Sequence, residues 1–368
     1  MKKILAILLS LSIVMSLCGC NEIQESTSTV DTQASTTQTD TTTTASESET
    51  VTTEKEEPII IENPTVTLMC AGDNLIHSPL YNQARQRALE KGIEGYDFDY
   101  AYQYVEELID IVDLSILNQE TIVSDEFEPS NYPFFCSPGD LGDKMIELGF
   151  DAVSISNNHC LDKGEAGLLS TLSYWKNTHP DIPVYGAYEN EDDMNNIRTL
   201  DVNGIKFAFL GYMEHTNGLY LPESSECELI YLSNLELIEQ QIRYADEIAD
   251  VVVISPHYGV EVTNTVTQTQ RDLTKLFVEW GADLIIGTQP HTVQTMEYID
   301  KPDGGKAFVF YCLGNLISAQ SSNLSMVGML GYLTITKDLT NNEIIISDVQ
   351  AVPLIDQYEV GSRNVRVY

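Results

Sequence analysis

Six polar clusters in this sequence combine residue types that bind metal ions and move protons. The clusters contain Asp73, Glu120, Asn158 with His159, His257, His291 and Asn315. Carboxylates, carboxamide oxygens and neutral imidazoles together suit divalent ions such as Mn²⁺, Fe²⁺ or Zn²⁺, whereas the absence of clustered cysteines disfavours a thiolate site. Two such ions bridged by a carboxylate would polarise a phosphoryl oxygen and activate a water molecule. A histidine outside the ligand set would protonate the leaving group, and His159 is best placed for that step.

A short apolar run precedes each cluster, and we expect these runs to be strands. Most of their residues are β-branched and regular polar alternation is missing, which is typical of strands buried on both faces. The runs cover residues 66–70, 114–117, 152–156, 251–254, 284–287 and 308–311. Helical apolar spacing predicts helices over 140–148, 236–249 and 270–280. Alternating strands and helices predict an α/β fold, in which the loops after the strands converge on one ligand crevice.

The number of clusters is what favours a site. A single Gly-Asp pair after a strand usually forms a turn, and a single buried histidine usually has a structural hydrogen bond. Six clusters at successive strand ends instead predict one shared centre. We expect it to gather Asp73, Glu120, Asn158, His159, His257 and His291.

The N-terminus has the pattern of a bacterial lipoprotein signal peptide. Lys2 and Lys3 precede an apolar run over residues 4–17, which is too short to favour a membrane-spanning helix. Leu17 stands three positions before Cys20, a spacing that resembles the bacterial lipobox. We therefore predict a lipoprotein signal peptide over residues 1–20 and acylation of Cys20, which would anchor the protein at the extracellular face of the bacterial cell membrane. An ordinary secretory signal is the competing interpretation.

The rest of the chain consists of two segments that differ in amino-acid composition. Residues 21–63 are rich in Thr, Ser, Glu and Gln and have too little apolar surface to offset the entropy of ordering, so we predict a disordered tether. Residues 64–368 contain no second linker and no solenoid repeat, and we predict one domain. The formal net charge of −37 argues against nucleic acid as a partner. Beyond the leader the cysteines are widely spaced without a CxxC pair, which favours buried thiols over disulfides or a zinc ribbon.

The motifs also occur in the order typical of one bacterial family. From residue 64 to about residue 354 the sequence resembles the CapA family of poly-γ-glutamate capsule-synthesis proteins. The resemblance rests on Ala71-Gly72-Asp73, Asn118-Gln119-Glu120, Asn157-Asn158-His159 followed by Asp162, His257-Tyr258-Gly259-Val260-Glu261, Pro290-His291 and Leu313-Gly314-Asn315. That family is in turn similar to the calcineurin-like metallophosphoesterases. The resemblance implies an α/β fold with a metallophosphoesterase-like β-sandwich flanked by helices, in α-β-β-α layers.

The resemblance further implies a role for each matching residue. It implies a centre for one or two divalent ions, Mn, Fe or Zn, with His159 as the proton donor. The implied metal ligands are Asp73, Glu120, Asn158, His257 and His291, with His77 as an additional ligand of the first motif and Gln289 at a position where the family has histidine. Residues implied to contact the ligands or the substrate are Asn118, Asn157, Asp162, Glu261 and Asn315.

Two motif positions depart from the family pattern. Gln289 replaces the first histidine of His-Pro-His. Its carboxamide still offers an oxygen but binds borderline metals less well than imidazole, so we expect weaker occupancy of one metal position. Gln119 replaces the leucine of Asn-Leu-Glu and leaves the flanking polar pair unchanged.

Three functions stay open at this level. The first is a metal-dependent hydrolase or transferase at the cell surface that acts on a phosphoester or an anionic polymer. The second is a non-catalytic accessory that binds cations or a poly-γ-glutamate-like chain and works with membrane capsule-synthesis partners. The third is a structural lipoprotein with a degenerate fold, which the retained ligand residues argue against. The resemblance implies a capsule role, but a fold does not determine a reaction.

Overall fold

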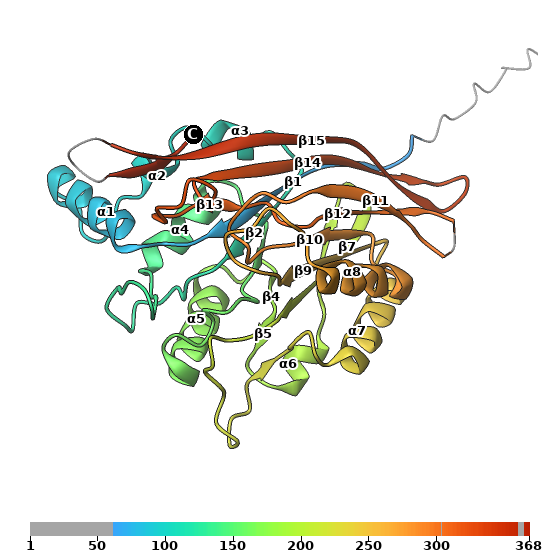
Figure 1. Ribbon diagram of the computed structural model, residues 1–368, viewed down its shortest axis with the longest axis horizontal. Helices are drawn as coiled ribbons and strands as arrows, with labels where there is room; N and C mark the ends of the chain where they lie inside the picture. Colours follow the sequence, from blue (N-terminus) through green and yellow to red (C-terminus); the bar gives the residue numbers. More distant parts are fainter. Residues whose placement is uncertain (1–61, 303, 360–363) are drawn as a thin grey trace, which may run out of the picture. The chain divides into compact units, whose positions relative to one another are not determined.

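Two β-sheets pack face to face in the part of the chain that the computed structural model describes, residues 62–302, 304–359 and 364–368 (Figure 1). These residues belong to one compact unit, Ile60–Tyr368. The predicted signal peptide with Cys20, and the predicted tether apart from residues 62 and 63, lie outside the described residues. Among the helices described, none has the length and apolar character needed to cross a membrane.

The first sheet has eight strands in the order β16-β15-β14-β1-β2-β3-β4, and β13 pairs with β1 beside this path. The strands are β1 (Thr65–Asn74), β2 (Leu114–Gln119), β3 (Ala152–Ser154), β4 (Val184–Tyr185), β13 (Asn315–Ile317), β14 (Val327–Asp338), β15 (Glu343–Tyr358) and β16 (Val365–Val367). The strands β1 to β4 are parallel, so their carboxyl ends lie at one edge, while β14 runs antiparallel to β1 and to β15.

The second sheet has six strands in the order β11-β12-β10-β9-β7-β6. They are β6 (Arg198–Val202), β7 (Ile205–Met213), β9 (Val251–His257), β10 (Leu284–Ile286), β11 (Met296–Asp300) and β12 (Lys306–Phe310). The four inner strands are parallel to one another and the two edge strands are antiparallel to them. A separate two-stranded ribbon joins β5 (Ala187–Tyr188) to β8 (Glu228–Leu229).

Alternate residues of the inner strands enter different hydrophobic cores. In β1, Leu68 and Cys70 lie in the core between the sheets, whereas Met69 lies in the core on the outer face. In β9, Val253 faces the other sheet and Val252 faces outward. Side chains of a strand point alternately to its two faces, so both faces of these strands are covered by apolar groups. The prediction of doubly buried strands is confirmed.

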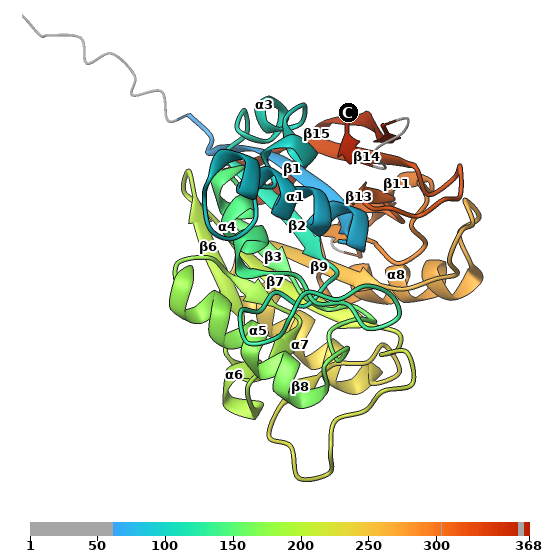
Figure 2. The same cartoon turned by 90° about the vertical axis from the view of Figure 1, so that its left-hand side faces the viewer.

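Helices cover the outer face of each sheet (Figure 2). On the first sheet these are α1 (Ser78–Lys91), α2 (Asp99–Tyr102), α3 (Glu106–Ile109), α4 (Gly139–Glu147) and α5 (Gly164–Thr178). On the second they are α6 (Glu191–Asn195), α7 (Leu235–Ile248) and α8 (Gln268–Trp280). The result is the four-layer α-β-β-α arrangement that the sequence predicts, and the α/β fold class is confirmed.

The predicted helices and cysteines agree closely with the structure. The segments 140–148, 236–249 and 270–280 correspond to α4, α7 and α8. Helix α8 begins earlier than predicted because Thr267 and Gln270 form a reciprocal capping box at its N-terminus. Every cysteine in the described residues is free and buried, as expected for thiols used as small core groups.

Candidate metal centre

The predicted ligands come from the strand ends of both sheets. Asp73 lies at the end of β1 and Glu120 directly after β2, in the first sheet. His257 ends β9, and His291 lies in the loop after β10, in the second sheet. Gly72 permits this convergence, because a Cβ atom at that position would overlap the carbonyl of Gly314. The centre therefore lies where the edges of the two sheets meet.

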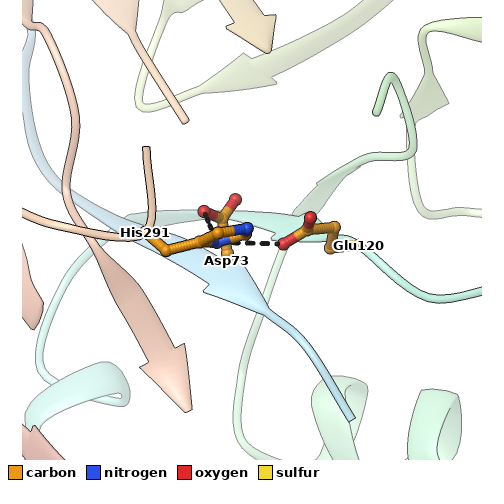
Figure 3. Close-up of side chains that lie close together, drawn as sticks. All are labelled: Asp73, Glu120 and His291. Carbon is orange, nitrogen blue, oxygen red and sulfur yellow. Dashed lines mark hydrogen bonds and ion pairs between the residues drawn. The ribbon is translucent and has the colours of Figure 1, made fainter. Parts of the chain in front are cut away.

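Asp73 is the anchor of the centre and is completely buried. Its Oδ1 accepts a hydrogen bond from Asn118 Nδ2 at 2.7 Å, and its Oδ2 lies 3.0 Å from His291 Nδ1. The same His291 nitrogen lies 3.1 Å from Asn315 Oδ1. Asp73, Glu120 and His291 offer ligand atoms that all lie within 4.8 Å of one another, and Figure 3 shows these side chains turned toward a common point.

Glu120 lies between the two histidines. Its Oε2 is 3.6 Å from His291 Nδ1, and its Oε1 is 3.7 Å from His257 Nε2. The same His257 nitrogen lies 3.0 Å from Asn158 Oδ1. One oxygen of Glu120 thus belongs to a group with Asp73 and His291, and the other to a group with His257 and Asn158. The two oxygens of Glu120 therefore face different histidines.

The two Glu120 oxygens, which accept no hydrogen bond, indicate that these residues fit a metal ion. Glu120 is completely buried, and neither carboxylate oxygen has a hydrogen-bond partner among the described residues. The oxygens of Asn118 and Gln289 are buried and unpartnered in the same way. Burying a carboxylate without compensation is strongly unfavourable, so such groups are normally paired or bound to a metal. Oxygen and imidazole donors without a thiolate suit a divalent cation, so Asp73, Glu120 and His291 could hold one.

Burial and neighbouring charges shift the pKa values of three groups in the centre, Glu120, His291 and His257. Burial raises the pKa of Glu120 well above its ordinary value. Burial opposes a charge on His291, but the carboxylates of Glu120 and Asp73 outweigh it and raise the pKa of His291 to about 10. His257 behaves in the opposite way, since burial lowers its pKa to about 3 and keeps the imidazole neutral. A divalent ion would supply the missing charge and displace protons from these groups.

The loop after β10 holds two ligand candidates in strained backbone conformations. Gln289 has φ 96° and His291 has φ 54°, values that favour glycine. The backbone N–H of Gln289 donates to Asp73 Oδ2 at 3.4 Å, and Thr288 Oγ1 lies 2.9 Å from His257 Nδ1. A backbone in such a conformation costs about 1–3 kcal/mol per residue. It is usually retained where the position of the side chain serves a function.

His159 belongs to a separate pair with Asp162. His159 Nδ1 lies 2.7 Å from Asp162 Oδ2, which also accepts the backbone N–H of Phe135 at 2.6 Å. The ring of Phe135 contacts the ring of His159 edge-on at 4.7 Å between centroids. Asn157 fixes the loop, because its Oδ1 accepts the N–H of His159 at 3.1 Å. The carboxylate orients the imidazole and leaves Nε2 for proton transfer.

Two predicted residues lie at the margin of the centre. His77 precedes α1, and its Nδ1 is 3.1 Å from the carbonyl of Leu75 and accepts the N–H of Ala319 at 3.2 Å. Only Nε2 of His77 is left to reach an ion, and among the described residues His77 has no hydrogen bond or ion pair with Asp73 or Glu120. Glu261 is exposed, and its Oε1 accepts Gln289 Nε2 at 3.4 Å.

Sequence reasoning missed two residues that support the centre. Thr288 Oγ1 contacts Nδ1 of His257, and the ring of Phe135 contacts the rings of His77 and His159. Thr288 directly precedes Gln289, so its place in the motif is the signal that could have revealed it. Phe135 follows no strand and has no local signal, because its position depends on how the loop after β2 folds back.

Residues 67–320 match the family described as bacterial capsule synthesis protein PGA_cap. This match covers more than half of the chain, and the protein belongs to that family. Its relatives include the capsule biosynthesis protein CapA of Bacillus anthracis, 26% identical over 267 residues that cover 70% of this chain and 61% of that protein. The PGA biosynthesis protein CapA of Bacillus subtilis (strain 168) is 27% identical over 237 residues, covering 64% of this chain and 60% of that protein. The chain thus spans about three fifths of the length of these relatives.

Solved structures with a related arrangement are more distant in sequence. A putative 5'-nucleotidase from Staphylococcus aureus has a TM-score of 0.48 and 15% identity, with 80% of this chain and 55% of that chain covered. The NAD nucleotidase of Haemophilus influenzae has a TM-score of 0.43 and 13% identity, with 79% of this chain and 50% of that chain covered.

Proposed function

We propose that this protein is a metal-dependent hydrolase of the phosphoesterase type that acts at the bacterial cell surface during capsule polymer synthesis. The observation that carries the proposal is the Glu120 carboxylate, which is buried between His291 and His257 and has no hydrogen-bond donor for either oxygen among the described residues. A structural role would have provided hydrogen-bond donors for such a group. A cation-binding role explains why imidazoles and oxygen donors surround it instead.

Residues of this chain divide into ion holders and a proton donor. Asp73, Glu120, Asn158, His257 and His291 would hold one or two ions. A bound divalent ion would act as a Lewis acid on a phosphoryl oxygen of the substrate. His159, oriented by Asp162, would carry a proton on Nε2 and give it to the leaving group. Because Asp162 accepts from Nδ1, the proton for transfer stays on the far side of the ring.

The location and the substrate are further parts of the proposal. The leader sequence with Cys20 supports a lipid anchor at the extracellular face of the membrane. The names of the two relatives connect them with capsule and PGA biosynthesis. We propose an anionic capsule polymer or its phosphoester precursor as substrate, and membrane proteins of capsule synthesis as partners.

The metal content of the purified mature protein tests the proposal. We expect bound divalent metal by elemental analysis, and hydrolysis of phosphomonoester or phosphodiester probes that stops after chelation and returns with Mn²⁺. Asp73→Asn and His257→Ala should each lower the metal-to-protein ratio while the circular dichroism spectrum stays unchanged. A wild-type protein that binds no divalent ion, or whose turnover is unaffected by chelation, would sink the proposal.

A non-catalytic accessory function has one observation in its favour, the glutamine at position 289. A carboxamide binds borderline metals less well than imidazole, which would suit cation-mediated binding of a polyanion without turnover. Stoichiometric metal, no turnover on the probe panel and metal-dependent binding of poly-γ-glutamate would together select this second function.

A further inference from the structure

We propose that Gln289 and Glu261 act as a pair that shifts the preference of the metal centre toward Mn²⁺ and away from Zn²⁺. In this pair Gln289 gives a carbonyl oxygen to the ion, and Glu261 is a positioning residue that orients the Gln289 amide. The inference rests on the proposed metal centre and adds the class of ion that the centre prefers.

The amide of Gln289 has one paired end and one unpaired end. Its Nε2 donates to Glu261 Oε1 at 3.4 Å, while its Oε1 is buried without a hydrogen-bond partner among the described residues. The residue is 2% exposed. The reverse orientation of the amide would bring two oxygen acceptors together with no proton between them. Glu261 therefore selects the orientation in which Nε2 faces Glu261 and the carbonyl oxygen is the buried, unpartnered end of the amide.

The backbone keeps Glu261 close to Gln289 although the Glu261 side chain is exposed. The N–H of Val262 donates to the carbonyl of Pro290 at 2.8 Å, and Thr292 Oγ1 donates to the carbonyl of Thr263 at 2.7 Å. These two bonds join the loop after β9 to the loop after β10 directly after the pair on both loops. The contact between the two side chains is thus part of the folded loops.

The types of atom that would bind the ion explain how the pair changes the preference between Zn²⁺ and Mn²⁺. With Gln289 the donors of the proposed centre would be oxygens from Asp73, Glu120, Asn158 and Gln289, and imidazole nitrogens from His257 and His291. Carboxylate and carbonyl oxygens suit Mn²⁺ and Mg²⁺, whereas each added imidazole favours Zn²⁺ more strongly than Mn²⁺. A glutamine at position 289 therefore lowers the preference for Zn²⁺ compared with a histidine there.

Competitive metal titrations of the purified mature protein test this inference directly. Dissociation constants for Mn²⁺ and Zn²⁺ would be measured by calorimetry with chelator competition in wild type, Gln289→His, Glu261→Ala and Glu261→Gln. Gln289→His should raise the ratio of Zn²⁺ affinity to Mn²⁺ affinity by about tenfold or more. Glu261→Ala should weaken Mn²⁺ binding by about 10–100-fold, the usual effect of removing a residue that orients a ligand. Glu261→Gln keeps an acceptor oxygen and should stay within about threefold of wild type.

A glutamate exposed on α3 provides the matched control. Glu107→Ala removes the same charge as Glu261→Ala and should leave both dissociation constants unchanged. An unchanged affinity ratio in Gln289→His, or Mn²⁺ binding in Glu261→Ala equal to wild type, would overturn the inference. Equal losses in Glu261→Gln and Glu261→Ala would overturn the orienting role of Glu261. A wild type that binds neither ion would overturn the proposed function as well, so the two failures are distinguishable.

Discussion

Asn74 and Gln119 form a buried amide pair beside the metal centre, with Asn74 Nδ2 donating a hydrogen bond to Gln119 Oε1 at 2.7 Å. Asn74 follows Asp73 on β1, and Gln119 is the last residue of β2, directly before Glu120, so the pair joins the two strand ends next to the carboxylates. Tyr102 Oη donates to Asn74 Oδ1 at 2.7 Å, which extends the network into the helical layer. Gln119 is also a position where the chain departs from the family motif.

Replacing Gln119 by the family's leucine should destabilise this protein. Gln119→Leu removes the carboxamide that accepts from Asn74 Nδ2 and donates to Thr121 Oγ1. Asn74 Nδ2 then keeps the weaker Met145 sulfur as acceptor, and Thr121 Oγ1 keeps Ser137 Oγ. We expect the free energy of unfolding to fall by about 1–3 kcal/mol, the usual effect of an unsatisfied buried polar group. Urea denaturation of wild type and variant measures this difference in the free energy of unfolding. Asn74→Ala and the double variant complete a cycle, and single effects that add within about 0.5 kcal/mol would show that the pair is not coupled.

His159→Ala should separate turnover from metal binding. His159 pairs with Asp162 and, among the described residues, makes no hydrogen bond or ion pair with Asp73 or Glu120, so we expect the metal-to-protein ratio of wild type. Turnover should fall by about 10²–10⁴-fold because the proton donor is missing. His257→Ala is the matched variant and should lose metal instead. Metal loss in His159→Ala as large as in His257→Ala would contradict the assignment of roles.

Gln289→Gly should raise stability while weakening the centre. Gln289 has φ 96°, which glycine adopts without strain; its buried Oε1 accepts no hydrogen bond, and its side chain would lose the long 3.4 Å hydrogen bond from Nε2 to Glu261. We expect the free energy of unfolding of the metal-free protein to rise by about 1 kcal/mol, since relief of strain exceeds the added entropy of the unfolded chain. Metal affinity should fall in the same variant. Lower stability of metal-free Gln289→Gly would show that the side chain has a structural role.

Asp356→Asn should stabilise the protein at neutral pH and not in acid. Asp356 is buried in β15, its Oδ2 accepts the N–H of Ser318 at 2.8 Å, and its Oδ1 has no partner among the described residues. Burial raises the pKa of Asp356 well above its ordinary value. The folded state therefore holds the proton more tightly than the unfolded state, and stability falls as pH rises from about 4 toward the folded pKa.

Asparagine does not titrate, so Asp356→Asn does not lose stability in this way as the pH rises. We expect its advantage over wild type to be at least about 1 kcal/mol near pH 7 and to shrink toward zero near pH 4. Thermal denaturation at both pH values gives the comparison. An equal difference at the two pH values would mean that the charge of Asp356 is not the cause.

Cys20→Ser should change the location of the protein, although this residue lies outside the described part of the chain. The leader predicts acylation of Cys20, so wild type should fractionate with membranes and carry a lipid detectable by mass spectrometry. The variant should appear in the medium or as an unprocessed precursor. A mature wild type that is free of lipid and absent from membranes would show that the leader is an ordinary secretory signal.

The sequence by itself determined six of the inner strands, three of the helices and the residue types that end those strands. Helices α7 and α8 follow from apolar residues at helical spacing, and each begins within two residues of its predicted start. The inner strands follow from uninterrupted apolar runs, because a strand covered on both faces needs apolar groups at every position. The sequence also indicates the candidate ligands Asp73, Glu120, His257 and His291, because each is a polar residue at or after the end of such a run. A polar group buried there is unfavourable unless it is hydrogen-bonded, paired with a charge or bound to a metal.

Only the tertiary structure decided how these strand ends face one another. The strands divide into two sheets, so that Glu120 of the first sheet reaches His257 and His291 of the second. The same packing pairs Gln289 with Glu261 and brings Ala319, far along the chain, to Nδ1 of His77. Local periodicity specifies which residues leave a strand, but not which other strand lies opposite or where a side chain points. Those are decided by the register of the strands and by the shared core between the sheets, which depend on contacts between residues distant in the sequence.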